Sequence, residues 1–196
     1  MAIKIVHYTD YKKETDKYIY INTTSRSELD WSRDFSPFYL GPCKLYGDFE
    51  SKNVENAWQY CKVYKKYLDL FGGPNEEYFK WAQSGWSNKS AVRYPMGKNA
   101  KPEYSYWDGK CYSYIQARKK IYVPLYVKSV IKTNGFKKLK ELYNSKIDIY
   151  LRDFDGYDHD LLNMSLTDVL NNPTKTMGHA FVLKMLLTGD ECLLQC

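Results

Sequence analysis

The sequence lacks the motifs that would identify a common enzyme class at once. It contains no G-x-G-x-x-G and no P-loop to hold phosphates, no H-E-x-x-H metal motif and no G-x-S-x-G nucleophile motif. Its five cysteines include no C-x-x-C pair, so neither a structural metal site nor a disulfide framework is expected. Any functional site must therefore be found from less specific patterns.

Long apolar runs are also missing. No stretch approaches the roughly 18 apolar residues that a membrane-spanning helix needs, and the N-terminal apolar patch is too short for a signal-peptide core. With the odd cysteine count, this favours a reducing, cytoplasmic location and no membrane partner. There is no repeat, low-complexity tract or linker. We expect one domain over residues 1–196, with residues 1–35 as an N-terminal extension that carries one strand.

Aromatic and basic residues are abundant. The 196 residues include 20 tyrosines, aromatic residues reach 17%, and the formal net charge is +6. A basic excess favours anionic partners such as nucleotides, DNA or RNA. The lysines are spread along the chain, so the alternative is that the charge serves only solubility.

Hydrophobic periodicity predicts an α+β fold in which helices dominate and a small β-sheet completes one domain. Strands are predicted at Lys17–Asn22 and at Lys146–Arg152, which alternates between apolar and polar residues. Residues 87–110 are predicted to form a long loop, which is often a functional segment. Apolar spacing and capping residues predict helices at Ser51–Leu70, Asn75–Trp86, 111–122, 124–133, Gly135–Ser145 and Gly178–Leu187, and a short helix beginning at Ser165.

Three polar residues share one face of the predicted helix at Ser51–Leu70. Glu55, Gln59 and Lys62 are spaced i, i+4, i+7. Glu55 falls in the first turn, where the helix dipole and the free N–H groups favour its anionic form. An ionised carboxylate suits the activation of water or the stabilisation of a cationic transition state. The alternative is a solvated helix face without a function.

An acidic segment follows the second predicted strand. It contains Asp153, Asp155, Asp158 and Asp160, with His159 among them. Loops that leave strand ends are frequent sites of binding and catalysis. The spacing lacks the alternating ligands and terminal glutamate of a calcium loop, and no motif supports a magnesium site, which stays an open alternative, so no metal ligand is assigned. The alternative is a plain acidic turn, and the spacing does not determine which carboxylate points inward.

Aromatic and cationic side chains supply candidates for ligand binding. Trp107 and Trp86 could stack on a flat base, whereas Trp58 lies on an apolar stripe and is expected in the core. Arg93 and Lys98 could hold phosphate, the arginine through a bidentate fork.

These segments occur in an order that resembles the NADAR family of N-glycosidases, as a divergent member would. Ser36-Pro-Phe-Tyr, Gly47 and Val54-Glu-Asn-Ala-Trp-Gln-Tyr are similar to the family's opening motifs. The strand that ends in Asp153-Phe-Asp-Gly-Tyr is similar to a later acidic segment, and Met177-Gly-His-Ala resembles the start of a closing helix. The chain departs from the pattern at Asn56, where the family has histidine.

The resemblance implies a domain of packed helices with a few strands, and hydrolysis of an N-glycosidic bond without a cofactor. The substrate would be an ADP-ribosyl or phosphoribosyl compound, with ADP-ribose on guanine in DNA among the candidates. The partner is thus a nucleotide-type small molecule or an ADP-ribosylated nucleic acid. The alternative is a non-catalytic module that captures a nucleotide or nucleic acid. A third reading is a nucleic-acid-binding protein without a nucleotide pocket.

The reaction assigns a role to each candidate residue. Hydrolysis passes through an oxocarbenium-like ribose, which needs a nearby anion and a positioned water. We expect Glu55, Asp153 and Asp155 to be catalytic, with Glu55 as the anion or base. The expected substrate-binding residues, for phosphate, ribose or base, are Gln59, Lys62, Trp86, Arg93, Lys98, Trp107 and His159.

Overall fold

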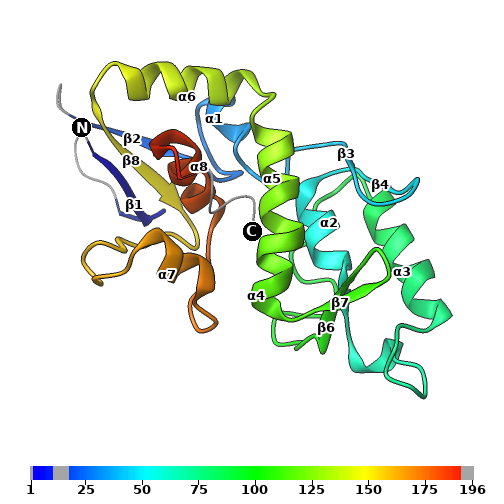
Figure 1. Cartoon of the computed structure of the whole chain (residues 1–196). Helices are drawn as coiled ribbons and strands as arrows, with labels where there is room; N and C mark the ends of the chain where they lie inside the picture. Colours follow the sequence, from blue (N-terminus) through cyan, green and yellow to red (C-terminus); the bar gives the residue numbers. More distant parts are fainter. Residues whose placement is uncertain (1, 11–17, 191–196) are drawn as a thin grey trace.

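The computed structural model describes residues 2–10 and 18–190 (Figure 1). The strands are β1 (Ile3–His7), β2 (Tyr18–Asn22), β3 (Cys43–Lys44), β4 (Glu50–Ser51), β5 (Lys62–Val63), β6 (Tyr104–Trp107), β7 (Lys110–Tyr112) and β8 (Asp148–Asp153). The helices are α1 (Asp30–Arg33), α2 (Val54–Tyr60), η1 (Lys65–Tyr67), α3 (Glu76–Ser87), α4 (Tyr114–Ala117), η2 (Arg118–Tyr122), α5 (Val123–Val130), α6 (Asn134–Asn144), α7 (Leu166–Asn171) and α8 (His179–Thr188).

A parallel three-stranded sheet with the order β1-β8-β2 forms one side of the molecule. β8 is the central strand, and the predicted alternation is confirmed because Ile149 and Leu151 are fully buried. The strand predicted at Lys17–Asn22 corresponds to β2, with Lys17 outside the described residues. Residues 1–35 were expected to be an extension, but they supply both outer strands of this sheet.

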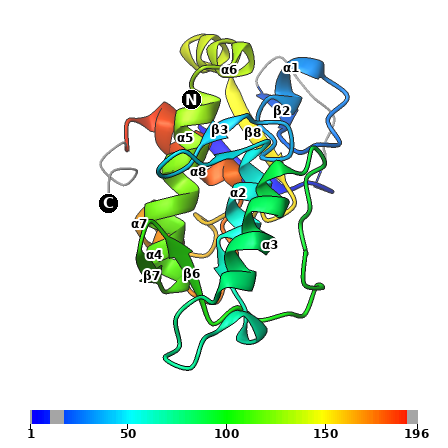
Figure 2. The ribbon, with the colours of Figure 1, turned by 90° about the vertical axis from the view of Figure 1, so that its right-hand side faces the viewer.

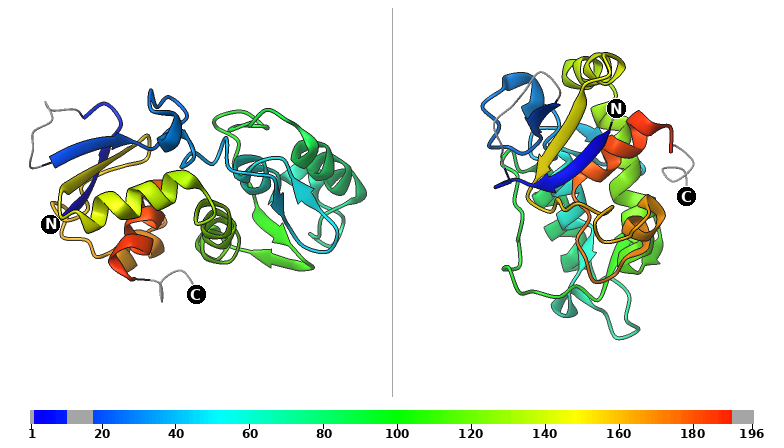
Figure 3. Two further views of the ribbon diagram at one scale, coloured as in Figure 1. Left: turned by 90° about the horizontal axis from the view of Figure 1, so that it is seen from above. Right: turned by 90° about the vertical axis from the view of Figure 1, so that its left-hand side faces the viewer.

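Two antiparallel sheets, β3-β4 and β5-β6-β7, lie on the opposite side of α5 from the parallel sheet (Figures 1 and 3). Helix accounts for 38% and strand for 17% of the described residues, so the prediction of a mixed α+β domain richer in helix is confirmed. The expected single small sheet is wrong, since these residues form three.

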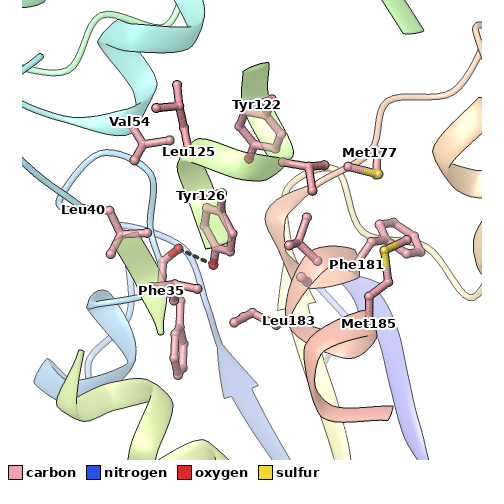
Figure 4. Packing of buried hydrophobic residues seen from close by; sticks show 14 of the residues in the cluster. Phe35, Leu40, Val54, Tyr122, Leu125, Tyr126, Met177, Phe181, Leu183 and Met185 are labelled. Atoms are coloured by element: carbon pink, nitrogen blue, oxygen red, sulfur yellow. Dashed lines mark hydrogen bonds between the residues drawn. The ribbon is translucent and has the colours of Figure 1, made fainter. Parts of the chain in front are cut away.

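The main core lies between the parallel sheet, α5, α8 and α2. Figure 4 shows Leu183 on the side of α8 that faces Tyr126 of α5 and the side chain of Phe35, whereas Phe181 points to the other side of α8. All four are fully buried, and the hydroxyl of Tyr126 donates a hydrogen bond to the carbonyl oxygen of Phe35 at 2.8 Å. This bond joins α5 to the segment that precedes β3.

A second cluster of buried side chains surrounds α3 and contains four of the 20 tyrosines. We call it the aromatic cluster: Tyr60, Val63, Tyr64, Tyr67, Tyr78, Ala82 and Trp86. Trp81 packs on its edge, with its ring centroid 4.7 Å from that of Tyr60 and 4.9 Å from that of Tyr67. Much of the aromatic richness of the sequence therefore serves packing and not ligand binding.

The predicted helix Ser51–Leu70 is wrong in its length. α2 begins at Val54, with the side chain of Asn53 accepting a hydrogen bond from the N–H of Asn56, and it ends at Tyr60. The next residues form β5, which pairs with β6 across 42 intervening positions, between Lys62 and Ser105. Such a distant pairing overrides a local helical pattern and leaves no local signal.

Residues 111–133 also differ from the prediction of two helices. α4, η2 and α5 are continuous, and η2 is a π-helical segment in which the N–H of Val123 donates to the carbonyl of Arg118. Pro124, the second residue of α5, has no N–H to donate. The predicted loop 87–110 contains the strand β6. A turn at Asp108-Gly109, in which both residues have positive φ, connects β6 to β7.

The helices with clear caps are confirmed. α3, α6 and α8 match their predicted ranges closely, and the capping box between Ser165 and Asp168 begins α7 as expected. In the described part of the chain, no helix combines the length and apolar character needed to cross a membrane.

Replacing Tyr126 with phenylalanine is expected to lower the free energy of unfolding by about 1–3 kcal/mol, because the carbonyl of Phe35 loses its buried donor. Urea denaturation measures the change. The control is Tyr39→Phe, because the Tyr39 side chain is 60% exposed, and it should change stability by less than about 0.5 kcal/mol. Equal stability of Tyr126→Phe and the wild type would show that this bond does not contribute.

Candidate functional site

A cavity of about 460 Å³ lies at the carboxyl end of the parallel sheet. Asp153, the last residue of β8, and Thr24, just after β2, line one side of it. Glu55 from α2 and Tyr122 from η2 also line it, so it lies where the sheet meets the central helices. The carboxyl ends of parallel strands are a common location for ligand sites.

The buried carboxylate of Asp153 joins three segments at the base of this cavity. Oδ1 accepts a hydrogen bond from the backbone N–H of Asp155 at 3.2 Å, and Oδ2 accepts one from the N–H of Ala180 at 3.0 Å. Nδ1 of His179 lies 3.2 Å from the same Oδ2. A Cβ on Gly178 would lie 2.2 Å from Oδ2, so this approach requires glycine. Asp153 thus fixes the start of α8 against the end of β8.

His179 extends this connection to β2. Its Nε2 lies 2.8 Å from the carbonyl oxygen of Thr23, and because a carbonyl only accepts, Nε2 carries a proton. The backbone N–H of Thr23 in turn donates to the carbonyl of Arg152 at 3.0 Å. The imidazole therefore lies between the ends of two strands and the first turn of α8.

Lys62, Gln59 and Glu55 form a chain of hydrogen bonds along one wall. The Lys62 ammonium donates to Gln59 Oε1 at 2.6 Å, and Gln59 Nε2 donates to Glu55 Oε1 at 2.9 Å. An ammonium group cannot accept a hydrogen bond, so it fixes which end of the Gln59 amide faces Glu55. Lys62 belongs to β5 instead of the helix, yet the three side chains meet as predicted.

Glu55 differs electrostatically from its prediction. It is only 7% exposed, and burial raises its pKa, while the Gln59 hydrogen bond and the charges of Lys62, Arg93 and His179 act in the opposite direction with smaller effect. Loss of hydration at this buried position therefore opposes the ionised form that the helix end was expected to favour. Burial also lowers the pKa of Lys62. Both groups are shifted toward their neutral forms.

Residues 88–103, which we call the strap, cross one side of the molecule without helix or strand (Figure 2). The buried side chain of Asn56 holds the first part of the strap: Nδ2 donates to the carbonyls of Asn88 and Ser90 at 2.9 and 3.0 Å, and Oδ1 accepts from the N–H of Val92 at 2.8 Å. The strap therefore has a fixed position beside α2.

The strap brings Arg93 to the cavity. Its guanidinium pairs with Asp155 Oδ2 at 3.0 Å, and both side chains remain about one-third exposed. Asp155 therefore lines the cavity together with Asp153, as predicted for the acidic segment, and its charge is compensated by Arg93.

Aromatic side chains form part of the cavity wall. The ring centroids of Trp58 and Tyr122 are 5.3 Å apart, and Lys62 Nζ lies 4.9 Å from the Trp58 centroid. Tyr94 from the strap and Tyr114 from α4 line the cavity and are each 45% exposed. Trp58, which was expected in the core, does pack against the main core, but it is only partly buried and also lines the cavity.

Arg118 lines the cavity but its donors bind the backbone. Its Nη1 donates to the carbonyls of Val169, Leu170 and Asn172 at 3.0, 3.1 and 3.0 Å, and its Nη2 donates to the hydroxyl of Tyr114 at 2.9 Å. The buried guanidinium caps the C-terminal end of α7 and anchors it to the π-helical segment.

The structure brings most of the predicted site together and separates the rest. Glu55, Gln59, Lys62, Arg93, Asp153 and Asp155 line the cavity. Trp86 is buried in the aromatic cluster, and Lys98 is exposed on the strap. Trp107 packs against Tyr46, with their ring centroids 5.0 Å apart. None of these last three residues lines the cavity, so their predicted contact with the base or phosphate is not supported.

His159 also lies apart from the cavity. Its Nδ1 is 2.6 Å from the carbonyl of Met164, and its Nε2 is 2.8 Å from Lys184 Nζ, which is also 3.6 Å from Asp160. Asp158 pairs with Lys4 at 3.5 Å. The acidic segment is thus divided, with its first two carboxylates in the cavity and its last two in ion pairs elsewhere.

The sequence patterns do not predict two residues of this region. Arg26 lines the cavity from a polar stretch after β2 that carries no motif, and Asn56 holds the strap. Among the described residues, no group of three or more His, Cys, Asp or Glu side chains is placed to hold a metal ion.

Glu55→Gln is expected to stabilise the protein at alkaline pH. A folded-state pKa above the unfolded value means that the stability contributed by Glu55 is fully present below the unfolded pKa and is lost as pH rises through the folded pKa. Glutamine cannot ionise, so the variant does not lose this stability as the pH rises. Urea denaturation at about pH 4 and about pH 8 should therefore show a stability gain for the variant at the higher pH only.

The matched control is Glu76→Gln, because Glu76 also lies in the first turn of a helix, α3, but is exposed. It should give no gain at the higher pH, since an exposed first-turn carboxylate is favourable there. A Glu55→Gln variant that is no more stable than the wild type at either pH would show that burial of this carboxyl carries no cost.

The chain belongs to the Family of unknown function (DUF6939), whose family model matches residues 4–183. No curated protein matches this sequence. The resemblance to the NADAR family is therefore wrong, because a different family covers all of the segments that suggested it. Packing accounts for two of those segments: Gly178 is required by its contact with Asp153, and Asn56 holds the strap.

Proposed function

We propose that this member of the family hydrolyses the N-glycosidic bond of a ribosyl compound, in which the ribose is linked to a nitrogen of an aromatic base. The observation that carries the proposal is the pairing, in one cavity, of a buried carboxyl group whose pKa is raised, Glu55, with a carboxylate held by an arginine, Asp155. Two carboxyl groups in different environments are what an acid and an anion of one glycosidic reaction require.

Glu55 supplies the acid. A raised pKa keeps the proton on the carboxyl group at a pH where an ordinary glutamate is ionised, so it can be donated to the leaving nitrogen. The side-chain amide of Gln59 fixes the orientation of this carboxyl group, because its Nε2 donates a hydrogen bond to Glu55 Oε1 at 2.9 Å. This role differs from the base expected from the helix position, and it follows from the burial of the side chain.

Asp155 supplies the anion. As the C1′–N bond breaks, its electron pair leaves with the base, the nitrogen takes the Glu55 proton, and positive charge develops on the ribose. The Asp155 carboxylate stabilises that charge and accepts a proton from the water that forms the new C1′–O bond. Asp155 then releases the proton it took from water to solvent, and Glu55 regains a proton from solvent, so both groups return to their starting states. Asp153 is a positioning residue here, since both of its oxygens already accept hydrogen bonds from the backbone.

The remaining wall suits the base. Trp58 and Tyr122 present aromatic surface beside Glu55, and Tyr94 adds a half-exposed ring at the strap. Stacking on such rings binds a flat base without a specific hydrogen-bond pattern. The volume of about 460 Å³ falls within the roughly 300–1,000 Å³ of small-molecule sites, which favours a nucleotide-type compound as the substrate.

Mass spectrometry of the products tests the proposal. The protein is incubated with NAD, a phosphoribosyl-amine compound and DNA that carries ADP-ribosylated guanine. We expect the free base and a free ribosyl product from at least one of these, and a rate about 10²- to 10⁴-fold lower for Glu55→Gln. Glu76→Gln is the control and should keep the wild-type rate. Full activity of folded Glu55→Gln, or no product from any compound, would contradict the proposal. Compounds that are retained but not cleaved would favour a binding module instead.

Lys62→Met is expected to shift the pH dependence of the reaction. Lys62 lowers the pKa of Glu55, so removing its charge raises that pKa further. Because the acid form is active, the decline in rate at high pH should move to higher pH. Lys65→Met, which removes an exposed charge outside the cavity, should leave the profile unchanged. A shift of the low-pH limb instead would assign Glu55 to the base role.

A further inference from the structure

Four cations line the cavity, and three of them already have partners. Lys62 donates to Gln59, Arg93 pairs with Asp155, and Arg118 donates to backbone carbonyls. Across residues 2–10 and 18–190, the guanidinium of Arg26 makes neither a hydrogen bond nor an ion pair. All of its N–H donors are therefore available to a ligand.

The Arg26 guanidinium is nevertheless held in place. Its central carbon lies 5.2 Å from the ring centroid of Phe154 and 5.9 Å from that of Tyr8. These two rings contact each other with centroids 4.2 Å apart. Tyr8 is fixed in turn, because its N–H donates to the carbonyl of Asp153 at 2.9 Å and its carbonyl accepts from Arg152 Nε at 2.8 Å. Stacking occupies the face of a guanidinium and leaves its edge free to bind.

The backbone beneath Arg26 is ordered by a short turn. The buried side chain of Thr24 donates to Asn22 Oδ1 at 2.8 Å and accepts from the N–H of Arg26 at 3.2 Å. The N–H of Ser27 donates to the carbonyl of Thr24 at 3.1 Å. This turn fixes the backbone from which the exposed Arg26 side chain extends, so the backbone loses little conformational entropy when a ligand binds.

We propose that Arg26 binds a phosphate group of the substrate at the mouth of the cavity, so that the site selects phosphorylated ribosyl compounds over free nucleosides. A free, stacked guanidinium presents the fork geometry that matches two phosphate oxygens. Neither Arg93 nor Lys62 can play this part without giving up its partner. The reading of the ligand as a ribosyl compound rests on the proposed function, whereas the recognition of phosphate by Arg26 does not.

Isothermal titration calorimetry with ribose 5-phosphate, ADP-ribose and ribose tests this inference without requiring turnover. Arg26→Gln should weaken the binding of phosphorylated ligands by about 10- to 100-fold and leave the binding of ribose unchanged. Arg26→Lys should weaken it less, because the charge remains while the fork is lost. The control is Lys128→Gln, which removes the same charge from an exposed position on α5 and should have no effect.

Each outcome decides between the possible sources of the phosphate or contradicts the inference. Arg26-dependent binding of ribose 5-phosphate indicates a phosphomonoester, and binding of ADP-ribose alone indicates a diphosphate. The inference is overturned if Arg26→Gln binds phosphorylated ligands as the wild type does, if it loses ribose equally, or if the wild type binds neither phosphorylated compound. Arg26-dependent binding without hydrolysis of any compound would leave this inference standing and remove the proposed function. Hydrolysis by Arg26→Gln with the KM of the wild type would overturn this inference and leave the proposed function standing.

Discussion

The position of the Asp153 carboxylate is the constraint on which the rest of the site depends. It ends the central strand of the parallel sheet, accepts the N–H of Ala180 at the start of α8, and lies 3.2 Å from His179. Gly178 has to be glycine for this contact to form. Because the same carboxylate accepts the N–H of Asp155, it also sets where the next acidic side chain enters the cavity. Fold and site are thus joined at one residue.

The burial of Glu55 is the corresponding constraint on the opposite wall. Glu55 is only 7% exposed, and this burial raises the pKa of its carboxyl group. The surrounding cations lower that pKa, but by less than burial raises it. Groups with strongly shifted pKa values cluster at functional sites, which is why Glu55 is central to the proposed function. The chain of hydrogen bonds through Gln59 to Lys62 orients the Glu55 carboxyl group, and both partners lower its pKa against the effect of burial.

Local signals in the sequence predict the parts of the fold that local chemistry decides. The capping box at Ser165 and the apolar spacing of α3, α6 and α8 give correct helices because caps and periodicity act within one turn. The parallel pairing of β8 with β1 and β2, and the early end of α2 at β5, depend on residues far apart in the chain. The Asp108-Gly109 hairpin carries a local signal that a search for long periodic segments overlooks.

For the site, the helical spacing predicts the contact between Glu55 and Gln59, whereas Lys62 reaches Gln59 from β5 and not from the helix on which it was expected. The end of the strand β8 places Asp153. The tryptophans cannot be assigned in this way, since the same ring packs in a cluster or lines a cavity according to the tertiary contacts around it. No sequence pattern predicts the role of Arg26. Its guanidinium is distinguished from the other cations of the cavity only by their partners, which depend on the tertiary structure.

The central claim is that burial raises the pKa of Glu55 inside a cavity that also contains the carboxylates of Asp153 and Asp155. Carbon-13 NMR of the side-chain carboxyl, assigned by comparison with Glu55→Gln and followed across pH, measures this directly. The account predicts a Glu55 titration midpoint above that of exposed glutamates such as Glu76. A midpoint equal to or below that of the exposed glutamates would contradict the account and return Glu55 to the role of an ordinary helix-end carboxylate.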